Sequence, residues 1–421
     1  MQANEQRLGT EFNRATAPQV VRARVLSIAP TSFFGDYGCH VRILEEARAL
    51  SRHGIATSIA TYPFGRPIDN LRLYRSPRLF GQRRVDPGSS PQKFSLDAVL
   101  AMSALRAAAI ERPQIVHGHL HEGALIGWLV AKAFQIPLVF DFQGSLTLEM
   151  IDHNFLKGGS AAYHAFRAIE TGILGLPDAI VTSTASGAQV LAREFGRDIR
   201  NIAVVPDGVD TDRFRPMWEI ADEDGHLARA ERLKASLGIP AERPVVVYLG
   251  LLAEYQGSSH LLQAAHALLR KGVDAHFLIM GFPGQRLYAG IARALGIEAN
   301  VTFTGAVPYE RAAEYLSLGT LAVAPKMSET EGNGKVLNYM AMGLPTVTFD
   351  TRASREILGD LGIYADRGDW QDLAEKIEAA LADSEGSHER GRALREKALH
   401  AHTWDLSSQV LVRTYERLTP L

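Results

Sequence analysis

The sequence predicts an α/β fold with two doubly wound, Rossmann-like domains that face a central cleft. The first observation is length, because 421 residues exceed what one hydrophobic core usually organises. The second is a regular alternation of apolar strands with amphipathic helices, which is typical of parallel sheets covered by helices. The third is a single interruption of that alternation, a charged and proline-containing stretch at 213–243 that we interpret as a linker.

The composition is that of a soluble globular protein, with 46% hydrophobic and 22% charged residues. A net charge of −2 gives no bulk attraction to nucleic acid, so we expect no nucleic-acid partner. The single cysteine, Cys39, fits a reducing compartment. No signal peptide is evident, and the most apolar stretch, 123–142, is interrupted too early to span a membrane. We therefore expect a cytoplasmic protein, with peripheral contact at the inner face of the membrane left open.

The first half of the chain begins with a polar arm, 1–19, which we expect to be flexible. A buried strand follows at 20–30, and a helix follows it because Val41, Leu44, Ala47 and Leu50 recur at near-helical spacing. Further strands are expected at 56–63, 71–75, 114–120, 137–142, 178–184 and 201–208. Helices are expected at 93–112, 122–134, 160–175 and 186–195. These elements make up an N-terminal domain, 20–212.

Ligands of parallel α/β sheets bind at the carboxyl ends of the strands. The polar and glycine residues that follow strands in this half are Gly35, Asp36, His119, His121, Glu122 and the run Asp141–Ser145, which includes Gln143 and Gly144. We therefore expect these residues near a substrate.

Three histidines alternate in the segment HGHLHEG, at His117, His119 and His121. Alternate residues of a strand stand about 7 Å apart, which is too far for three ligands of one ion. We therefore expect no metal here. Instead, His119 or His121 should hydrogen-bond a polar substrate, and His117 should be an interior histidine with its hydrogen bonds satisfied.

Six arginines and one acidic residue, Asp69, lie between Arg66 and Arg84. Two interpretations remain open for this stretch. It is either a solvated loop region or a rim that meets a phosphate-bearing acceptor or an anionic membrane surface.

The second half repeats the alternation. Strands are expected at 245–250, 276–281, 301–305, 321–325 and 346–349. They define a C-terminal domain, 244–403. The last helix, 404–421, has one apolar stripe and should pack back on the first domain. The acidic pair at Asp210 and Asp212 should form a turn and caps rather than a metal site.

The stretch 324–349 carries the clearest chemistry in the sequence. A buried strand leads into a glycine-bearing loop with Gly332 and Gly334, and a short helix follows. Glycines allow close backbone approach to a ligand, and a helix N-terminus with free amides favours an anion. Lys326 at the strand end and Lys335 at the helix start could reach the same anion. The sequence therefore predicts a phosphate or diphosphate site here.

Taken in order, these motifs resemble the retaining glycosyltransferases of family 4, which have the GT-B fold. The resemblance covers about 20–418. It rests on the segments IAP, FFGDYGCHV, HLHEG, VFDFQGS, VVPDGVDTDRF, VVVYLGLLAEYQG, FTGAVPYE and EGNGKVLNYMAMGLPTV.

The resemblance implies that the C-terminal domain binds a nucleotide-diphosphate sugar and that the N-terminal domain binds the acceptor. His121 would lie near the reacting sugar carbon, Glu331 (or, by a competing alignment, Glu329) would contact donor hydroxyls, and the loop 305–308 would meet the base. Lys326 and Lys335 would stabilise the leaving diphosphate without a metal ion. The remaining donor-side positions are Gly35, Asp36, Gly281, Val307, Gly332, Asn333, Gly334, Val336 and Asn338. The acceptor-side positions are His119, Glu122, Gln143 and Gly144.

The chain departs from the family pattern at four places. Gly35-Asp36 replaces a Gly-Gly pair, and Leu251 and Gln256 replace an Arg and a Lys. Asn338 replaces the second glutamate of a paired-Glu motif.

The expected activity is retaining transfer of a sugar to a hydroxyl of a glycan, glycolipid or small molecule. The alternatives are a binding protein without catalysis, or a sugar phosphorylase or nucleotide-sugar epimerase on the same fold.

Overall fold

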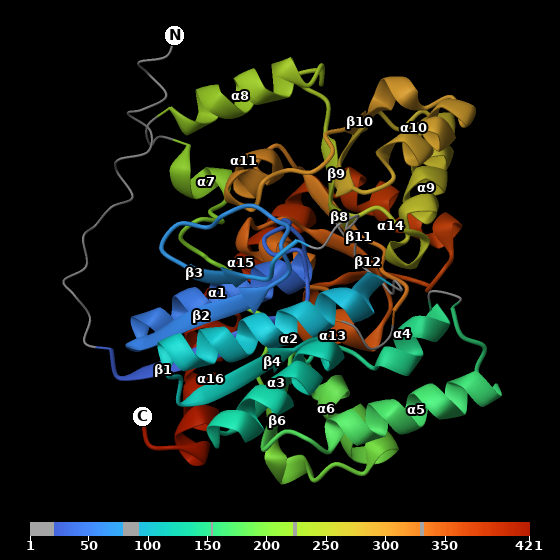
Figure 1. The fold of residues 1–421 in the computed structure, drawn as a ribbon. Coiled ribbons are helices and arrows are strands. Elements are labelled where there is room, and N and C mark those ends of the chain that lie inside the picture. Colours follow the sequence, from blue (N-terminus) through green and yellow to red (C-terminus); the bar gives the residue numbers. More distant parts are fainter. Residues whose placement is uncertain (1–20, 79–91, 153–154, 222–224, 329–331) are drawn as a thin grey trace.

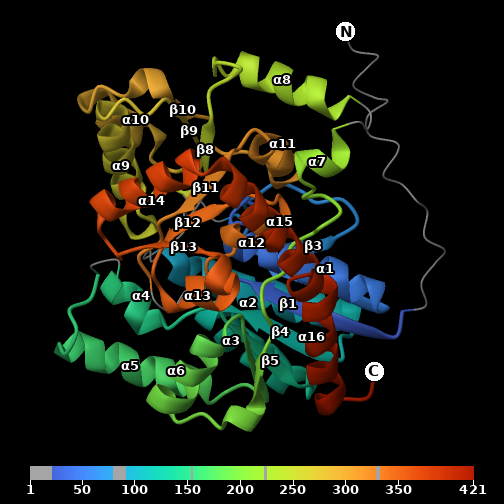
Figure 2. The same ribbon diagram turned by 180° about the vertical axis from the view of Figure 1, so that it is seen from behind.

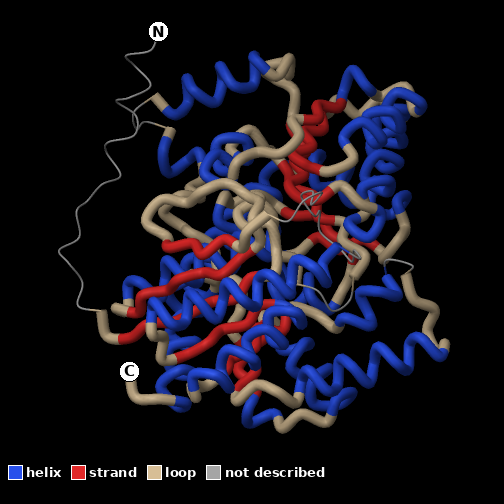
Figure 3. The backbone as a smooth tube through the Cα atoms, viewed as in Figure 1, coloured by secondary structure: helices blue, strands red, loops and turns tan. Residues whose placement is uncertain are grey.

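The computed structural model describes residues 21–421, except 79–91, 153–154, 222–224 and 329–331. The expected arm at 1–19 and the two glutamates Glu329 and Glu331 lie outside the described residues. The chain forms two α/β domains, one above the other in Figure 1, with the strands enclosed between helices in Figure 3. The prediction of two doubly wound parallel sheets is confirmed.

The first sheet has seven strands in the order β3-β2-β1-β4-β5-β6-β7, and all its pairings are parallel. Its strands are β1 (Ala23–Ala29), β2 (Ile55–Thr61), β3 (Arg72–Arg75), β4 (Ile115–His119), β5 (Leu138–Phe142), β6 (Ala179–Thr182) and β7 (Ile202–Val204). The accompanying helices are α1 (Gly38–Arg52), α2 (Gln92–Glu111), α3 (Leu120–Phe134), α4 (Leu146–Asp152), α5 (Ala161–Leu174) and α6 (Ala185–Phe195). The strands and helices agree with the sequence prediction, which did not include α4.

The second sheet has six parallel strands in the order β10-β9-β8-β11-β12-β13. They are β8 (Val245–Leu251), β9 (His276–Phe282), β10 (Val301–Phe303), β11 (Leu321–Ala324), β12 (Thr346–Phe349) and β13 (Ile363–Ala365). The sequence prediction missed β13, a three-residue edge strand with too few residues to show a periodicity.

Helices α7 (Met217–Ile220) and α8 (His226–Ser236) belong to the connection between the sheets. The helices of the second half are α9 (Ser258–Arg270), α10 (Gln285–Ala294), α11 (Ala312–Leu316), α12 (Lys335–Ala341), α13 (Arg352–Leu358), α14 (Trp370–Ala382), α15 (Ser384–Ala401) and α16 (Trp404–Leu418). Among the described residues, no helix has both the length and the apolar character needed to cross a membrane.

Strand alternation assigns the two faces of the first sheet to different helices. Leu26 and Ile28 of β1 pack with residues of α2 and α3, whereas Ala23 and Val25 pack with residues of α16. The C-terminal helix therefore covers the first sheet beside α1, and Figure 2 shows the two helices together.

The chain crosses between the domains at two adjacent places. Val209, after the first sheet, forms an isolated parallel bridge with Thr403, just before α16. A β-carbon at Gly208 would lie 2.5 Å from the Trp404 amide nitrogen, so only glycine allows the two crossings to approach this closely. In each sheet the strand order reverses beside the first strand, between β1 and β4 and between β8 and β11. Ligands of open α/β sheets bind at such switch points.

Candidate functional site

A cleft of about 390 Å³ lies between the two domains. The first domain contributes residues that follow β1, β4 and β5, and the second contributes residues that follow β8 and β11. Both switch points therefore open into the same space.

The wall formed by the second domain carries both predicted lysines. Lys326 follows β11, and its Nζ donates to the carbonyl oxygen of Gly332 at 2.8 Å. Lys335 begins α12, and its Nζ donates to Oε1 of Gln256 at 2.6 Å and lies 5.0 Å from the centre of the Tyr248 ring. The Lys326 ammonium group thus contacts the glycine loop, whereas the Lys335 ammonium group lies against β8 and the residues after it.

Asn333, between the loop glycines, also lines the cleft. Its side chain is only 2% exposed, and its amide oxygen and nitrogen have no hydrogen-bond partner among the described residues. A buried amide without a partner is costly, so this side chain is a candidate contact for a polar ligand.

Two of the predicted donor positions, Val336 and Gly281, are not among the described residues that line the cleft. Val336 packs in the core, and its amide donates to the carbonyl of Asn333 at 2.9 Å, while the Leu337 amide donates to that of Gly334. The first turn of α12 therefore satisfies two of the amides expected to be free, although no described side chain caps this helix. Gly281 lies outside the described cleft lining, and a β-carbon there would lie 2.7 Å from the Gly250 carbonyl oxygen. It is a packing glycine between β8 and β9.

The first loop also differs from the expectation. The Gly35 amide donates to Nδ1 of His40 at 2.7 Å, and Gly35 is not among the described lining residues, so its role at the donor stays a prediction that the geometry does not support. Asp36 does line the cleft, but its carboxylate accepts from Arg66 and from the Tyr309 amide. Its charge is thus neutralised by protein groups. The backbone that faces the cleft at the start of α1 is Gly38, where a β-carbon would meet no atom within 4 Å.

The acceptor-side wall contains His121, Glu122, Gln143 and Gly144. His121 begins α3 rather than ending the strand, and its Nε2 lies 3.4 Å from Oε1 of Glu170. Glu122 pairs with Lys93 at 3.2 Å, and Gln143 donates to Asp141 at 2.7 Å. All four residues therefore line the same cleft as Lys326 and Lys335.

His119 is not among the described lining residues, so its role on the acceptor side stays a prediction that the geometry does not support. The His119 side chain is 1% exposed, and its Nδ1 lies 3.0 Å from Asp141 Oδ2. The physical reason is strand alternation, because the last residue of β4 points to the face covered by α1, where His117 also lies. The rings of His117 and His119 are 4.4 Å apart, closer than the spacing of about 7 Å expected along a strand, because both side chains lean toward each other on the same face of the sheet. His121 lies elsewhere, at the first turn of α3.

Sequence reasoning missed Arg42, a buried arginine on α1 that lines the cleft. Its guanidinium holds Asp141 through Nε and Nη2 at 3.0–3.2 Å and Asp207 through Nη1 at 2.7 Å. Burial alone would raise the pKa of Asp141, but Arg42 and His119 outweigh burial and hold it well below its ordinary value. The available signal was a charged residue among the apolar positions of a helix that packs on a buried strand.

Asp207 connects this network to the donor-side loop. Its Oδ2 lies 3.4 Å and 3.5 Å from the positions that β-carbons would take at Gly332 and Gly334. A β-carbon at either glycine would be in ordinary van der Waals contact with this carboxylate, so the loop lies directly against Asp207 where the two domains meet.

The residues at which the chain departs from the family pattern line the cleft as well. These are Leu251, Gln256 and Asn338, together with Val307 of the loop expected at the base. Gln256 accepts a hydrogen bond from Lys335. The Gln256 amide, at a position where the family pattern has a cation, therefore holds the Lys335 ammonium group in place.

The arginine stretch separates into structural pairs. Arg66 contacts both Asp36 and Glu310, Arg72 pairs with Glu111, and Arg75 donates to three backbone carbonyls. Arg83 and Arg84 lie outside the described residues. The expected turn at Asp210 is present, since its Oδ1 accepts from the amides of Asp212 and Arg213.

Two family models match the chain, one in each half. Residues 38–213 match the model for Glycosyltransferase Family 4, and residues 229–398 match the model for glycosyl transferases group 1. Among curated proteins, a D-inositol 3-phosphate glycosyltransferase of Nocardia farcinica is 28% identical over 396 residues, covering 90% of this chain and 84% of the relative. The enzyme of the same name from Mycobacterium tuberculosis is 28% identical over 405 residues, covering 90% and 78%.

Solved structures share the fold at low sequence identity. Sucrose-phosphate synthase from Thermosynechococcus elongatus superposes with a TM-score of 0.78 at 18% identity, covering 94% of this chain and 99% of that one. HepE of Anabaena, solved in complex with UDP-glucose, superposes with a TM-score of 0.72 at 13% identity, covering 94% and 100%.

Proposed function

The chain belongs to the family-4 glycosyltransferases of the GT-B fold, and from this premise we propose that it transfers a sugar, with retention, from a nucleotide-diphosphate sugar to an acceptor hydroxyl. In this proposal the second domain (244–403) binds the donor. The first domain (20–212, completed by 404–421) binds the acceptor, and 213–243 is the linker.

The observation that carries the proposal is the common location of Lys326, Asn333 and Lys335 on one wall of the cleft. Two cations and an amide that has no hydrogen-bond partner among the described residues suit a diphosphate, whose negative charge grows as the sugar bond breaks. Each charge-assisted hydrogen bond to a phosphate oxygen contributes about 1.5–3 kcal/mol. These groups would take the place of the cations that the family has at positions 251 and 256.

In the reaction we propose, the bond from the anomeric carbon to the diphosphate oxygen breaks, and the acceptor hydroxyl adds to the same face of the sugar. The leaving phosphate oxygen takes the hydroxyl proton. His121 would position the donor sugar, because Glu170 holds its ring from behind and Phe140 and Phe142 contact it edge-on. Glu331 would contact donor hydroxyls. Lys326 and Lys335 would neutralise the diphosphate, so no added divalent ion should be needed.

Two comparisons guide the choice of substrates. HepE holds UDP-glucose in its structure, so a UDP-sugar is the first donor to test. The relatives named D-inositol 3-phosphate glycosyltransferase make a phosphorylated cyclitol one acceptor to test beside unphosphorylated sugars and a glycolipid. A glycolipid acceptor would bring the enzyme to a membrane surface.

A screen of donor hydrolysis and transfer tests this function. The full chain would be incubated with UDP-, GDP- and ADP-sugars, with and without the acceptors above, and the released nucleotide diphosphate would be measured. With one donor class, we expect the enzyme to release nucleotide diphosphate slowly when no acceptor is present and faster when an acceptor is added. NMR of the product should show the same anomeric configuration as in the donor. Inverted product, or release that no acceptor accelerates, would contradict the proposed reaction.

The Lys335→Ala variant tests the site itself. We expect its affinity for the nucleotide diphosphate to fall at least tenfold, measured by calorimetry. Lys271→Ala is the matched control, because Lys271 is an exposed lysine of the same domain that pairs with Glu378. Unchanged affinity in Lys335→Ala would remove Lys335 from the diphosphate site.

A further inference from the structure

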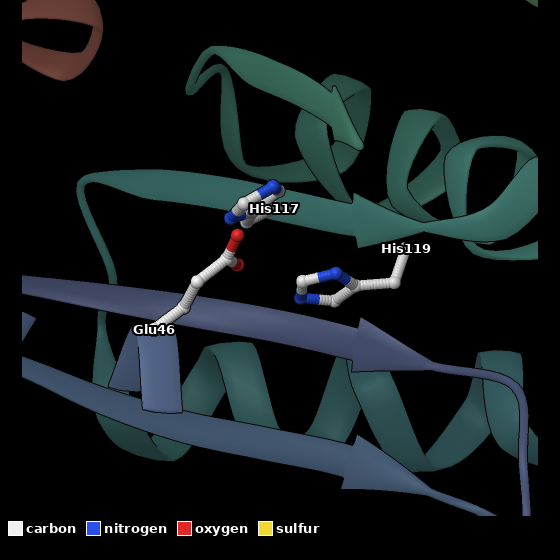
Figure 4. Close-up of side chains that lie close together, drawn as sticks. All are labelled: Glu46, His117 and His119. Atoms are coloured by element: carbon white, nitrogen blue, oxygen red, sulfur yellow. The ribbon is translucent and has the colours of Figure 1, made fainter. Parts of the chain in front are cut away.

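A buried cluster of three potential metal ligands lies outside the cleft, beneath α1. Glu46 comes from α1, and His117 and His119 come from β4 (Figure 4). One ligand atom from each side chain lies within 4.8 Å of the others, and none of the three is more than 4% exposed. Of the residues described as lining the cleft, none belongs to this trio.

The geometry of the elements explains why the trio meets. His117 and His119 are two apart on a strand, so both side chains lie on the same face of the sheet. Helix α1 covers that face, and Figure 4 shows the Glu46 side chain extending from α1 toward the two rings. Residues separated by about seventy positions in sequence are thus brought together in the core.

Each of the three side chains is oriented by a separate partner. His117 Nδ1 lies 2.8 Å from the Tyr415 hydroxyl, and His119 Nδ1 lies 3.0 Å from Asp141 Oδ2. Arg42 Nη2 forms an ion pair with Glu46 Oε1 at 3.0 Å. Outer partners of this kind, a carboxylate or hydroxyl on one ring nitrogen, typically fix the tautomer and direction of metal-binding histidines.

Two of the three side chains, Glu46 and His117, have inward atoms without a hydrogen-bond partner among the described residues. His117 Nε2 and both carboxylate oxygens of Glu46 are fully buried without a hydrogen bond among the described residues. The Arg42 contact with Glu46 is close, but it does not have hydrogen-bond geometry. Unsatisfied buried polar atoms cost free energy, so a native cluster of them calls for a bound group.

The charge balance of the cluster also favours a cation. Arg42 is the buried arginine that pairs with this cluster. Its guanidinium is shared between Glu46, Asp141 and the partly exposed Asp207. Three carboxylates therefore face one guanidinium. A buried carboxylate is stable as an anion only with a matching positive charge.

We propose that Glu46, His117 and His119 form a buried divalent-cation site, and that Zn²⁺ is the ion best matched to it. Two imidazole nitrogens and one carboxylate oxygen are a ligand set that zinc takes with one further position open. Ligand atoms around a tetrahedral zinc ion lie about 3.4 Å apart. The three ligand atoms here lie within 4.8 Å of one another, so side-chain rotations would have to bring them closer together to bind the ion. The ion would tie α1 to β4 and, through Tyr415, to α16.

The rival occupant is a proton. Protonated Glu46 could donate to His117 Nε2 and would leave the charge of Arg42 to Asp141 and Asp207. The two occupants differ in their response to Glu46→Gln, because the amide mimics a carboxylic acid and is a poor zinc ligand.

The test uses the full chain purified without chelator, with metal content measured by mass spectrometry. We expect about one zinc per chain. After removal of the metal, Zn²⁺ or Co²⁺ should raise the melting temperature, and Co²⁺ should give the visible absorption of a low-coordinate site. The Glu46→Gln variant should bind at least tenfold more weakly. Glu45→Gln is the control, since this buried neighbour on α1 pairs with Arg48 outside the cluster and should keep the metal.

The wild-type measurements decide the proposal even if a variant fails to fold. A purified wild-type chain without metal, whose melting temperature neither ion changes, would overturn the site. Equal zinc affinity in Glu46→Gln would overturn it too. If the wild-type chain holds no metal and neither ion changes its melting temperature, a Glu46→Gln variant as stable as the wild type would identify a proton as the occupant.

Discussion

A β-carbon at Gly250 would lie 2.7 Å from Cε and 3.1 Å from Nζ of Lys335, so glycine at the end of β8 makes room for the lysine side chain. The same lysine is fixed from the other side by Gln256. The position of the ammonium group in the cleft thus depends on two residues of the β8 segment, some eighty positions earlier in the sequence.

Gly250→Ala should therefore weaken nucleotide-diphosphate binding by about tenfold, because the methyl group displaces the Lys335 ammonium and removes one charge-assisted contact. Calorimetric titration with the nucleotide diphosphate measures the effect. Gly290→Ala is the control, since a β-carbon there meets no atom within 4 Å. Equal affinities in both variants would show that Lys335 reaches the diphosphate from another position.

Replacement of His121 should affect turnover more than donor binding. We expect His121→Asn to lower kcat by about a hundredfold, since loss of a positioning group misplaces the reacting carbon, while nucleotide affinity stays within twofold. Steady-state kinetics with saturating donor measures this, and His164→Asn on the exposed surface of α5 is the control. An unchanged kcat would exclude His121 from the reaction.

The ion pair between Arg66 and Glu310 joins the two domains at 2.8 Å beside the cleft. Both side chains are more than a third exposed, so the pair contributes only about 0.2–1 kcal/mol. We expect Glu310→Gln to lower kcat/KM by about two- to fivefold through weaker closure, with the difference smaller at high salt. Glu314→Gln, which breaks a pair within the second domain, should leave kcat/KM unchanged. A salt-independent loss would point to a role other than charge pairing.

Asp97 should make stability depend on pH. Burial raises its pKa to about 6, although the Tyr62 hydroxyl donates to its Oδ1 at 2.6 Å and opposes the rise. The folded state therefore binds a proton more tightly than the unfolded state does. Its contribution to stability is present below about pH 4 and is lost as pH rises to about 6, by up to about 2 kcal/mol.

The Asp97→Asn variant removes this titration while keeping an oxygen for Tyr62. The melting temperature of the variant should match the wild type near pH 4 and exceed it increasingly between pH 4 and 6.5, with a constant difference above. Scanning fluorimetry across pH measures the trend, and Asp212→Asn at an exposed turn is the control. A difference that does not change with pH would contradict the assignment.

Loss of packing at Leu411 should destabilise the first domain. This side chain of α16 is fully buried against β1 residues Ala23 and Val25. Leu411→Ala should lower the free energy of unfolding by about 2–5 kcal/mol, measured by urea denaturation. Leu406→Ala, at a 41% exposed position of the same helix, should cost less than about 1 kcal/mol. Similar effects at both positions would mean that α16 is not part of this core.

The sequence by itself determined the strand and helix order apart from elements such as α4 and β13, the two-domain α/β class and the glycine and lysine motif of the second domain. These features depend on local periodicity and on chain punctuation at residues such as Gly343 and Pro345, which act over a few neighbouring positions. Spacing along the chain was enough to place Lys326 and Lys335 at the ends of a strand and a helix.

Only the tertiary structure decided which side chains share a space. His119 and His121 are two residues apart, yet one lies in the core with Asp141 and the other in the cleft, because the strand ends and the helix begins between them. Arg42 and Glu46 acquire their partners from β4, β5 and the segment after β7, more than seventy residues away. Contacts over such separations follow from sheet order and from the face that each helix covers, and neither is encoded in local spacing.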